Sequence, residues 1–335
     1  MVAKAVEEAP SLEDVLAAIN GKHGVNSVLR AKDQPLQDVT AVSTGSIRLD
    51  MALGIGGLPL GRVVEIYGPE SSGKTTLALQ TMANVQRSGG TAVMIDAEHA
   101  LDLDYARSLG VDTDKLIISQ PDSGEQALDI AKQFAGSGRV NVIVVDSVAA
   151  MVPIAELQGE VGDSHVGQKA RMMGQALRIL TPMLAQNNCL LLFINQLREK
   201  VGVTYGSPET TPGGKALPFA ASVRLDIRRR EPIKAAGDKV IGHKTKVTVK
   251  KNKMAPPLAV AEFELYFGLG VNLEGEILDV GAEMDLVKKA GAFYSLPDGT
   301  RIGQGKTNSS AFLRDNPGLR DDLERQIRER LGWAK

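Results

Sequence analysis

The sequence has few aromatic residues, one cysteine and no long apolar run. Aromatic side chains make up 4% of the 335 residues, which argues against a module that binds single strands by stacking bases on aromatic platforms. Cys189 lies in an apolar run and has no cysteine to pair with in the chain, so we expect a buried, inert thiol. The apolar runs, such as CLLLFI, are strand-sized, and the N-terminus lacks a signal-peptide core. We therefore expect a cytoplasmic protein without a membrane partner.

Net charge is also nearly absent. The formal charge of −1 predicts no polyanionic partner by itself, and the four histidines show no spacing typical of zinc ligands. The charge is unevenly distributed, because residues 224–253 hold eleven Lys/Arg against three Asp/Glu. This stretch is either a phosphate-facing surface or a solvated edge hairpin protected by lysines, and charge alone does not choose between them.

Three regions follow from the pattern along the chain. Residues 1–35 hold one short amphipathic helix pattern, SLEDVLAAI, with Ser11 as N-cap and Asp14 at the capping-box position, and VNSVLR after it is compatible with an exposed strand. An arm this small cannot form a hydrophobic core by itself, so we expect it to pack on another surface, such as a neighbouring subunit. Residues 36–271 form the main domain, and residues 272–335 resemble a small α+β domain.

The main domain alternates between strand and helix patterns. Continuous apolar strands separated by helices predict an α/β fold with a mostly parallel sheet covered on both faces. The last three strands lack intervening helices and predict an antiparallel extension. Pro182, inside a long helical pattern, should kink or distort that helix. The expected strands are RVVEIYG, TAVMIDA, LIISQ, VNVIVVDS, CLLLFINQ, ASVRLDIRR, KTKVTVKK and AEFELYF.

The stretch GPESSGKT matches the P-loop pattern G-x-x-x-x-G-K-[ST], between a strand and a helix. Its two glycines let the backbone turn so that N–H groups converge on phosphate oxygens. The lysine charge faces the β/γ oxygens, and the following threonine is a ligand for Mg²⁺. A flexible turn is the alternative, and the strand–helix context favours the phosphate cradle. The expected nucleotide site, for ATP and Mg²⁺, comprises Gly68, Pro69, Glu70, Ser71, Ser72, Gly73, Lys74, Thr75 and Thr76.

A second acidic anchor for the metal is expected at the end of a buried strand. VNVIVVDS supplies Asp146 there, and with Lys74 it forms a pair of Walker A and Walker B type. The strand TAVMIDAEH ends beside the P-loop in a parallel sheet and offers Asp96 and Glu98. We predict Glu98 as the catalytic base and Asp96 as a structural carboxylate; capping of the next helix is the alternative for both, although Asp102 already serves that purpose.

Several motifs occur in the order and at the spacing of the bacterial RecA recombinase family. They are GPESSGKTT, IDAEHALD, VVDSVAA, GEVGDSH, ARMMGQALR, FINQ, PETTPGG, SVRLDIRR and KNK, and the resemblance runs from about residue 40 to the C-terminus. It implies a DNA-dependent ATPase that forms a helical filament on single-stranded DNA and exchanges it with homologous duplex DNA in recombination, DNA repair and the SOS response. Loader and regulator proteins and the SOS repressor are the further partners it implies.

The resemblance also implies roles for residues around the nucleotide. Glu98 resembles the family's catalytic glutamate, and Gln196 resembles the γ-phosphate sensor that is followed by a DNA-binding loop. Asp102 and Tyr105 resemble the adenine contacts. Lys251 and Lys253 are similar to lysines that reach the phosphates of a neighbouring subunit, as an arginine finger does. Part of the basic stretch would then face ATP across a subunit interface.

Two glycine-rich polar loops, ELQGEVGDSHVGQKA and LREKVGVTYGSPETTPGG, resemble the family's DNA-binding loops. Long loops with glycines and a few cations suit sequence-independent phosphate binding, and a disordered active-site lid is the alternative. Two lysines of the C-terminal region resemble residues that guide duplex DNA, with solvated surface lysines as the alternative. The implied DNA contacts are Lys169, Arg171, Arg178, Arg198, Lys200, Gly213, Gly214, Lys289 and Lys306.

Three features depart from the family pattern. The N-terminal arm is only loosely similar. Phe219, an implied interface residue, is kept, but Pro218 and Ala220 stand where the family has a lysine and a tyrosine, so coupling between subunits could differ. The C-terminus lacks the acidic run that is common in the family. Its absence would favour duplex binding, because an acidic tail competes with DNA. A hexameric motor and a regulatory ATP-binding protein remain the rival classes, and the two loops and KNK favour the recombinase.

Overall fold

A computed structural model of the chain describes residues 9–33, 39–160, 167–199, 209–235 and 237–333. The chain forms two compact units, residues 1–39 and residues 40–335. In the first unit, α1 (Leu12–His23) begins at Ser11 with the predicted capping box to Asp14. The strand expected after it is absent, because the Asn20 amide bonds the N–H and C=O of Val28 (2.9 and 3.1 Å), and the chain continues into a 3₁₀ turn, Ala31–Asp33.

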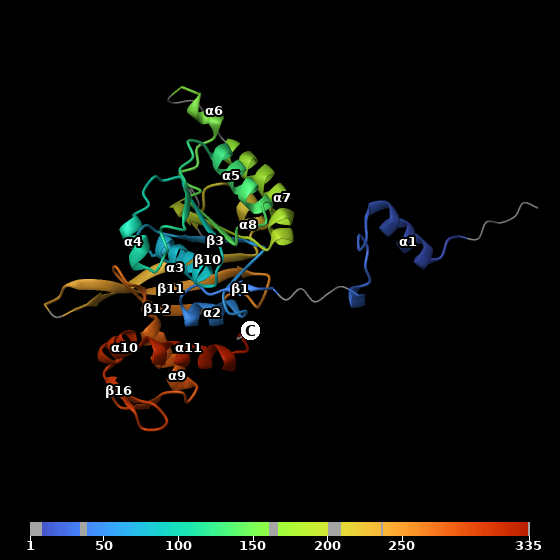
Figure 1. Cartoon of the computed structure of the whole chain (residues 1–335). Coiled ribbons are helices and arrows are strands. Elements are labelled where there is room, and N and C mark those ends of the chain that lie inside the picture. The colour runs from blue at the N-terminus through green and yellow to red at the C-terminus, as the bar shows by residue number, and fades with distance from the viewer. Residues whose placement is uncertain (1–8, 34–38, 161–166, 200–208, 236, 334–335) are drawn as a thin grey trace, which may run out of the picture. The chain divides into compact units, whose positions relative to one another are not determined.

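The second unit is built on a nine-stranded sheet, which confirms the predicted α/β class (Figure 1). The strand order is β13-β12-β11-β10-β3-β7-β6-β4-β5. Neighbours from β10 to β5 are parallel, and β10 to β13 form the antiparallel extension. Its strands are β3 (Val63–Gly68), β4 (Ala92–Asp96), β5 (Ile117–Ser119), β6 (Val142–Asp146), β7 (Leu190–Gln196), β10 (Val223–Lys234), β11 (Val240–Asn252), β12 (Val260–Tyr266) and β13 (Gly270–Val271).

The helices of this unit are α2 (Ile47–Leu53), α3 (Lys74–Arg87), α4 (Leu103–Ser108), α5 (Gly124–Gly136), α6 (Ile154–Leu157), α7 (Gln168–Asn187), α8 (Ala216–Ala220), α9 (Leu273–Glu283), α10 (Lys306–Asp315) and α11 (Pro317–Arg330). Short strands outside the main sheet are β1 (Ala41–Val42), β2 (Leu58–Pro59), β8 (Arg198–Glu199), β9 (Glu209–Thr210), β14 (Lys288–Ala290), β15 (Phe293–Ser295) and β16 (Arg301–Gln304). In the described residues, none of the helices combines the length and hydropathy that a membrane crossing requires.

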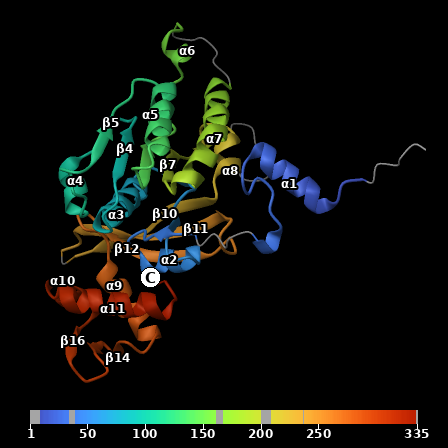
Figure 2. The same cartoon turned by 45° about the vertical axis from the view of Figure 1, so that its right-hand side comes forward.

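Strand residues alternate between two hydrophobic cores, as the period of two requires. In β6, Val142 and Val144 pack with α3 in one core, whereas Ile143 and Val145 pack with α5 and α7 in the other. Figure 2 shows α5 and α7 side by side over the sheet. Helix α7 runs as one helix through Pro182, so the expected distortion does not break it. Cys189 is buried, as predicted, and burial raises the pKa of its thiol to about 12.

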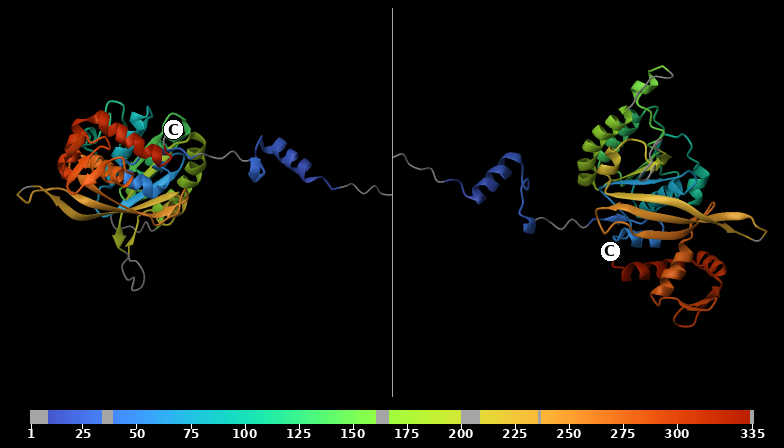
Figure 3. Two further views of the ribbon diagram at one scale, coloured as in Figure 1. Left: turned by 90° about the horizontal axis from the view of Figure 1, so that it is seen from below. Right: turned by 180° about the vertical axis from the view of Figure 1, so that it is seen from behind.

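A third core lies among α9, α10, α11 and the small sheet β14-β15-β16 near the C-terminus (Figure 3). Two buried carboxylates join this region to α2. Asp50 accepts hydrogen bonds from Ser43 Oγ (2.6 Å) and from Thr44, and pairs with Arg328 of α11 at 3.3 Å. Glu276 of α9 accepts from Ser46 Oγ (2.8 Å) and from the N–H of Arg48 (3.0 Å). Burial is the main reason that the pKa of Asp50 rises to about 6 and that of Glu276 to about 7.

Glu276→Gln is expected to weaken the pH dependence of stability. The pKa of Glu276 rises from 4.5 to about 7 on folding, so between pH 4.5 and about pH 7 the folded state holds a proton that the unfolded state has lost. The associated stability is present below pH 4.5 and is lost as the pH rises through about 7. Urea unfolding at pH 5 and pH 8 should therefore differ less in the variant, by roughly 1–3 kcal/mol. An unchanged difference between the two pH values would contradict this assignment.

Candidate nucleotide-binding and active site

The P-loop connects the end of β3 to the start of α3, in a backbone path that only glycine fits at two positions. A Cβ on Gly68 would lie 2.2 Å from the carbonyl oxygen of Ile227. Gly73 has φ +96°, and a Cβ there would lie 2.6 Å from Cδ1 of Leu265. Residues of β10 and β12 therefore pack closely against the loop, and this restricts its backbone to a path that would suit phosphate binding.

Lys74 is buried, and its ammonium group points back into the P-loop. Its Nζ donates to the carbonyl oxygens of Gly68 (3.2 Å) and Pro69 (2.7 Å). Burial lowers the pKa of Lys74, and the nearby charges of Asp146, Glu98 and Glu70 act in the opposite direction. The cation therefore sits where phosphate oxygens would replace two weaker carbonyl partners.

Thr75 and Asp146, the predicted metal ligands, place two oxygen donors side by side. The Thr75 hydroxyl donates to Oδ2 of Asp146 at 2.7 Å, from the start of α3 to the end of β6. Burial raises the pKa of Asp146 to about 6, and the hydrogen bond from Thr75 opposes this shift. Hard oxygen donors of this kind fit Mg²⁺. No group of three or more His, Cys, Asp or Glu side chains in the described ranges could hold a metal alone, so phosphate and water oxygens would complete the shell.

Glu98 lies beside this pair, in the turn after β4. Its Oε1 accepts hydrogen bonds from the Ser147 hydroxyl and from Nε2 of Gln196 (3.2 Å), which ends β7. Asp96 instead accepts from the N–H groups of Ala100 (3.3 Å) and Leu101 (3.2 Å), so its carboxylate shapes the turn that presents Glu98. The structure thus brings together the predicted base and the predicted sensor.

The predicted adenine contacts lie on α4. Asp102 caps this helix by accepting from the N–H groups of Asp104 and Tyr105, as its sequence position predicted. The Tyr105 hydroxyl lies 2.7 Å from Oγ1 of Thr76 on α3. After β12, Phe267 is 57% exposed, and Gly270, the first residue of β13, lies close to Gln80 of α3 and to Leu109, which follows α4.

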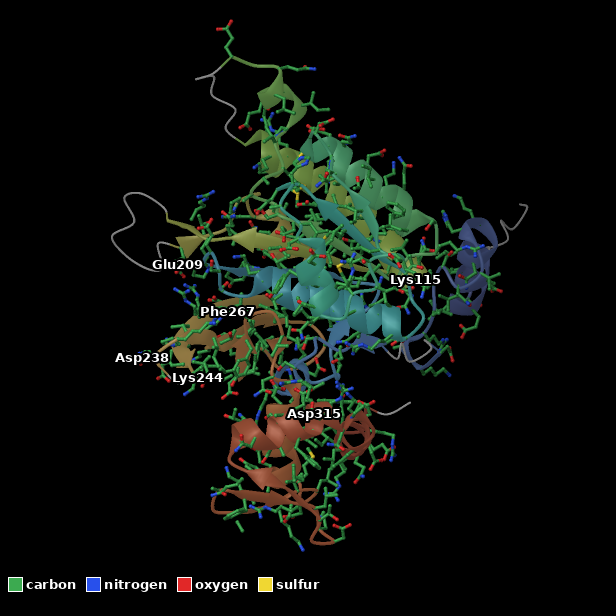
Figure 4. The ribbon with its side chains drawn as sticks, turned by 60° about the vertical axis from the view of Figure 1, so that its left-hand side comes forward. Lys115, Glu209, Asp238, Lys244, Phe267 and Asp315 are labelled. Carbon is green, nitrogen blue, oxygen red and sulfur yellow. The ribbon has the colours of Figure 1, made fainter. Side chains whose placement is uncertain are left out.

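The cations predicted to act across a subunit interface lie at the end of β11. Lys251 Nζ donates to the carbonyl oxygens of Pro218 (2.8 Å) and Phe219 (2.9 Å) in α8. Burial, Lys253 and Arg224 lower the pKa of Lys251. The side chain of Phe219 is 73% exposed, although phenylalanine normally favours burial. Figure 4 shows the opposite end of the β10–β11 hairpin, with Asp238 and Lys244 near Phe267.

The described ends of the two predicted DNA loops lie next to each other. A Cβ on Gly214 would lie 2.7 Å from Cβ of Ala170 in α7, and Gly213 faces Val148. Lys169 Nζ donates to the carbonyl of Ala149 (2.9 Å), and burial and Arg198 lower its pKa. Arg171, Arg178 and Arg198 are exposed, whereas Lys200 and residues 161–166 lie outside the described residues.

A pocket of about 370 Å³ joins the P-loop to the base of the second loop. It is lined by Pro69, Glu70, Gln196, Leu197, Arg198 and Glu209. Glu209 accepts two hydrogen bonds from Arg228 (2.7 and 2.6 Å), which fixes β9 against β10. The sensor strand and the loop that follows it therefore border the same space as the phosphate cradle.

The two lysines predicted to guide duplex DNA differ in their surroundings. Lys289 is exposed, with its Nζ 5.4 Å from the centre of the Tyr294 ring. Lys306 pairs with Asp279 (2.8 Å) and Glu264 (3.6 Å), and these carboxylates raise its pKa although burial lowers it. Lys306 thus holds α10 against α9 and β12, and its DNA contact remains a prediction.

The α/β sheet, the P-loop and the Thr75–Asp146 pair define a P-loop nucleotide-binding protein. The family model of the RecA N-terminal domain matches residues 10–272, and that of the RecA C-terminal domain matches residues 275–332. Protein RecA of Pseudarthrobacter chlorophenolicus is 56% identical over 331 residues, covering 99% of this chain and 94% of the relative. Protein RecA of a Nocardioides species is 58% identical over 322 residues, covering 96% and 91%. The chain belongs to the RecA family.

Proposed function

We propose that this chain is a DNA-dependent ATPase that forms a helical filament on single-stranded DNA, pairs it with homologous duplex DNA and exchanges strands. Its family makes it a homologous-recombination and DNA-repair protein. The observation that carries the proposal is the hydrogen bond between Glu98 and Gln196, because Gln196 ends the strand that runs into the second loop.

In the proposed mechanism, the P-loop N–H groups and Lys74 hold the phosphates of ATP. Bound Mg²⁺, held by Thr75 and Asp146, would neutralise charge on the β- and γ-phosphates. Glu98 orients and deprotonates the attacking water, and Ser147 keeps its carboxylate in place. Gln196 changes partner between Glu98 and the γ-phosphate, which moves the base of the second loop and so links nucleotide state to DNA binding.

Assembly completes the site. Lys251 and Lys253 would reach the phosphates bound by a neighbouring subunit, and the exposed Phe219 would pack into that neighbour. A head-to-tail interface that does not close produces a filament. We also propose that residues 272–335 act as a small domain that guides duplex DNA through Lys289, that the protein works in the cytoplasm, and that loader proteins, regulators and the SOS repressor bind the filament.

The first test is ATP hydrolysis with and without single-stranded DNA. We expect DNA to stimulate the rate at least about tenfold, and Lys74→Ala to abolish this, because the P-loop loses its charge on the phosphates. DNA-independent hydrolysis would indicate a regulatory ATPase, and a closed ring that unwinds duplex directionally would indicate a hexameric motor. Either result would contradict the recombinase mechanism.

A further inference from the structure

A fully buried carboxylate lies in β3, three residues before the P-loop, and is shared by the strands on both sides. Glu65 Oε1 accepts from Nδ2 of Asn195 in β7 at 3.0 Å. Its Oε2 accepts from Nε of Arg224 in β10 at 2.6 Å. A buried ion pair adds little stability over an apolar packing of the same volume. Its presence at the centre of the sheet therefore needs another explanation.

One oxygen of Glu65 is linked through Asn195 to Gln196, the predicted sensor of the subunit's own nucleotide site. The Asn195 amide donates to Glu65 and also to the carbonyl of Pro212 (3.1 Å), directly before Gly213. Its Oδ1 accepts from the backbone N–H of Gln196 (3.0 Å), and Gln196 bonds Glu98. Glu65 thus fixes which way the Asn195 amide points, and this amide holds both the sensor backbone and the end of the second loop.

The other oxygen of Glu65 is linked through Arg224 to the cations at the end of β11. The Arg224 guanidinium lies 4.6 Å from the centre of the Tyr67 ring, and Arg224 is the cross-strand partner of Lys251. The Lys251 ammonium bonds the carbonyls of Pro218 and Phe219. Its neighbouring charges include Glu65, which favours the protonated form, and Arg224 and Lys253, which oppose it. Glu65 therefore holds Arg224 beside Tyr67 and partly offsets its repulsion of Lys251.

We infer that Glu65 is a positioning residue that couples the two nucleotide sites to which one subunit contributes. Through Asn195 it fixes the position of the sensor, Gln196, in the subunit's own site. Through Arg224 it fixes the position of the cations that would reach the neighbour's site. A shift of β7 on nucleotide binding would then change the positions of β10 and β11 through the contacts of Glu65. This inference rests on the proposed function, since it requires that Lys251 act across the interface.

The experiment compares Glu65→Gln with wild type in ATP hydrolysis on single-stranded DNA. Asn195 and Arg224 donate to different oxygens of Glu65, and the glutamine amide replaces one of these oxygens by an NH2 group, so one of the two donors then faces another donor. We expect kcat to fall about tenfold, KM to change less than about threefold, and the Hill coefficient for ATP to fall towards one. In the double variant Glu65→Gln/Asn195→Asp, donor and acceptor are exchanged, and the Hill coefficient should partly recover.

Asp50→Asn provides the matched control. Asp50 is also fully buried and pairs with an arginine, Arg328 at 3.3 Å, but it lies between α2 and the C-terminal helices. It should lower stability as Glu65→Gln does and leave the Hill coefficient unchanged. Unaltered kinetics in Glu65→Gln, or an equal loss of cooperativity in Asp50→Asn, would overturn the inference.

Hydrogen exchange without DNA separates this inference from the proposed function. Glu65→Gln should accelerate amide exchange at Gln196 and in residues 211–214, whether or not the wild type hydrolyses ATP. Unchanged exchange there would overturn the positioning of the sensor, even in a DNA-stimulated enzyme. If wild type shows no DNA-stimulated hydrolysis while exchange changes as expected, the proposed function fails and the coupling of two sites fails with it.

Discussion

Glu98→Gln is expected to reduce DNA-stimulated ATP hydrolysis by at least about 100-fold and to leave ATP affinity within about threefold of wild type. In the proposed mechanism the carboxylate takes the proton from water, whereas Lys74, Thr75 and the P-loop N–H groups would hold the phosphates. The amide keeps the shape of the side chain and an oxygen for the Ser147 hydroxyl. Steady-state hydrolysis and titration with a fluorescent ATP analogue measure the two quantities.

Asp104→Asn is the matched control for charge. Asp104 lies on α4, shortly after Glu98 in the sequence, is exposed, and pairs with Arg107. It should leave both hydrolysis and affinity unchanged. Hydrolysis by Glu98→Gln at more than about a tenth of the wild-type rate would show that another group activates the water.

Arg328→Met is expected to lower the free energy of unfolding by about 3 kcal/mol at pH 7.5, because it leaves Asp50 buried without its cation. The loss should be smaller at pH 5. The pKa of Asp50 is already about 6 beside Arg328, and without the arginine it rises further. Protonation at pH 5 then removes the unpaired charge. Urea unfolding at both pH values measures the effect.

Arg325→Met on the same helix is the control for this prediction. Arg325 is exposed, and its ion pairs with Asp322 and Glu329 are solvated. Exposed pairs contribute little, so no measurable change is expected. An equal effect of both variants would mean that α11 is stabilised by its general charge and not by the buried contact. In Arg328→Met/Asp50→Asn, part of the lost stability should return.

Local sequence patterns predicted the elements that carry the site. Alternation and apolar runs located eight of the nine strands of the main sheet, since side chains of a parallel sheet must fill the cores on both faces, whereas the two-residue strand β13 was not predicted. The P-loop was predicted from Gly68, Gly73 and Lys74, because these residues lie within one short segment between a strand and a helix. The exposed strand expected after α1 was wrong, because the Asn20 side chain takes the hydrogen bonds of Val28. Local competition of this kind leaves no periodic signal.

The sequence by itself determined the family, the α/β class and the position of each motif, since each motif is a pattern of residues that lie close together in the chain. Only the tertiary structure decided which distant residues meet. Glu98 and Gln196 touch because β7 and β4 flank β6, and Lys306 is held in ion pairs because α10 packs on α9. In the sequence, Glu65 is one residue of an apolar strand. Its role as a shared acceptor becomes visible only because β3 lies between β7 and β10. Strand order depends on packing of the whole chain, so spacing along the sequence does not encode it.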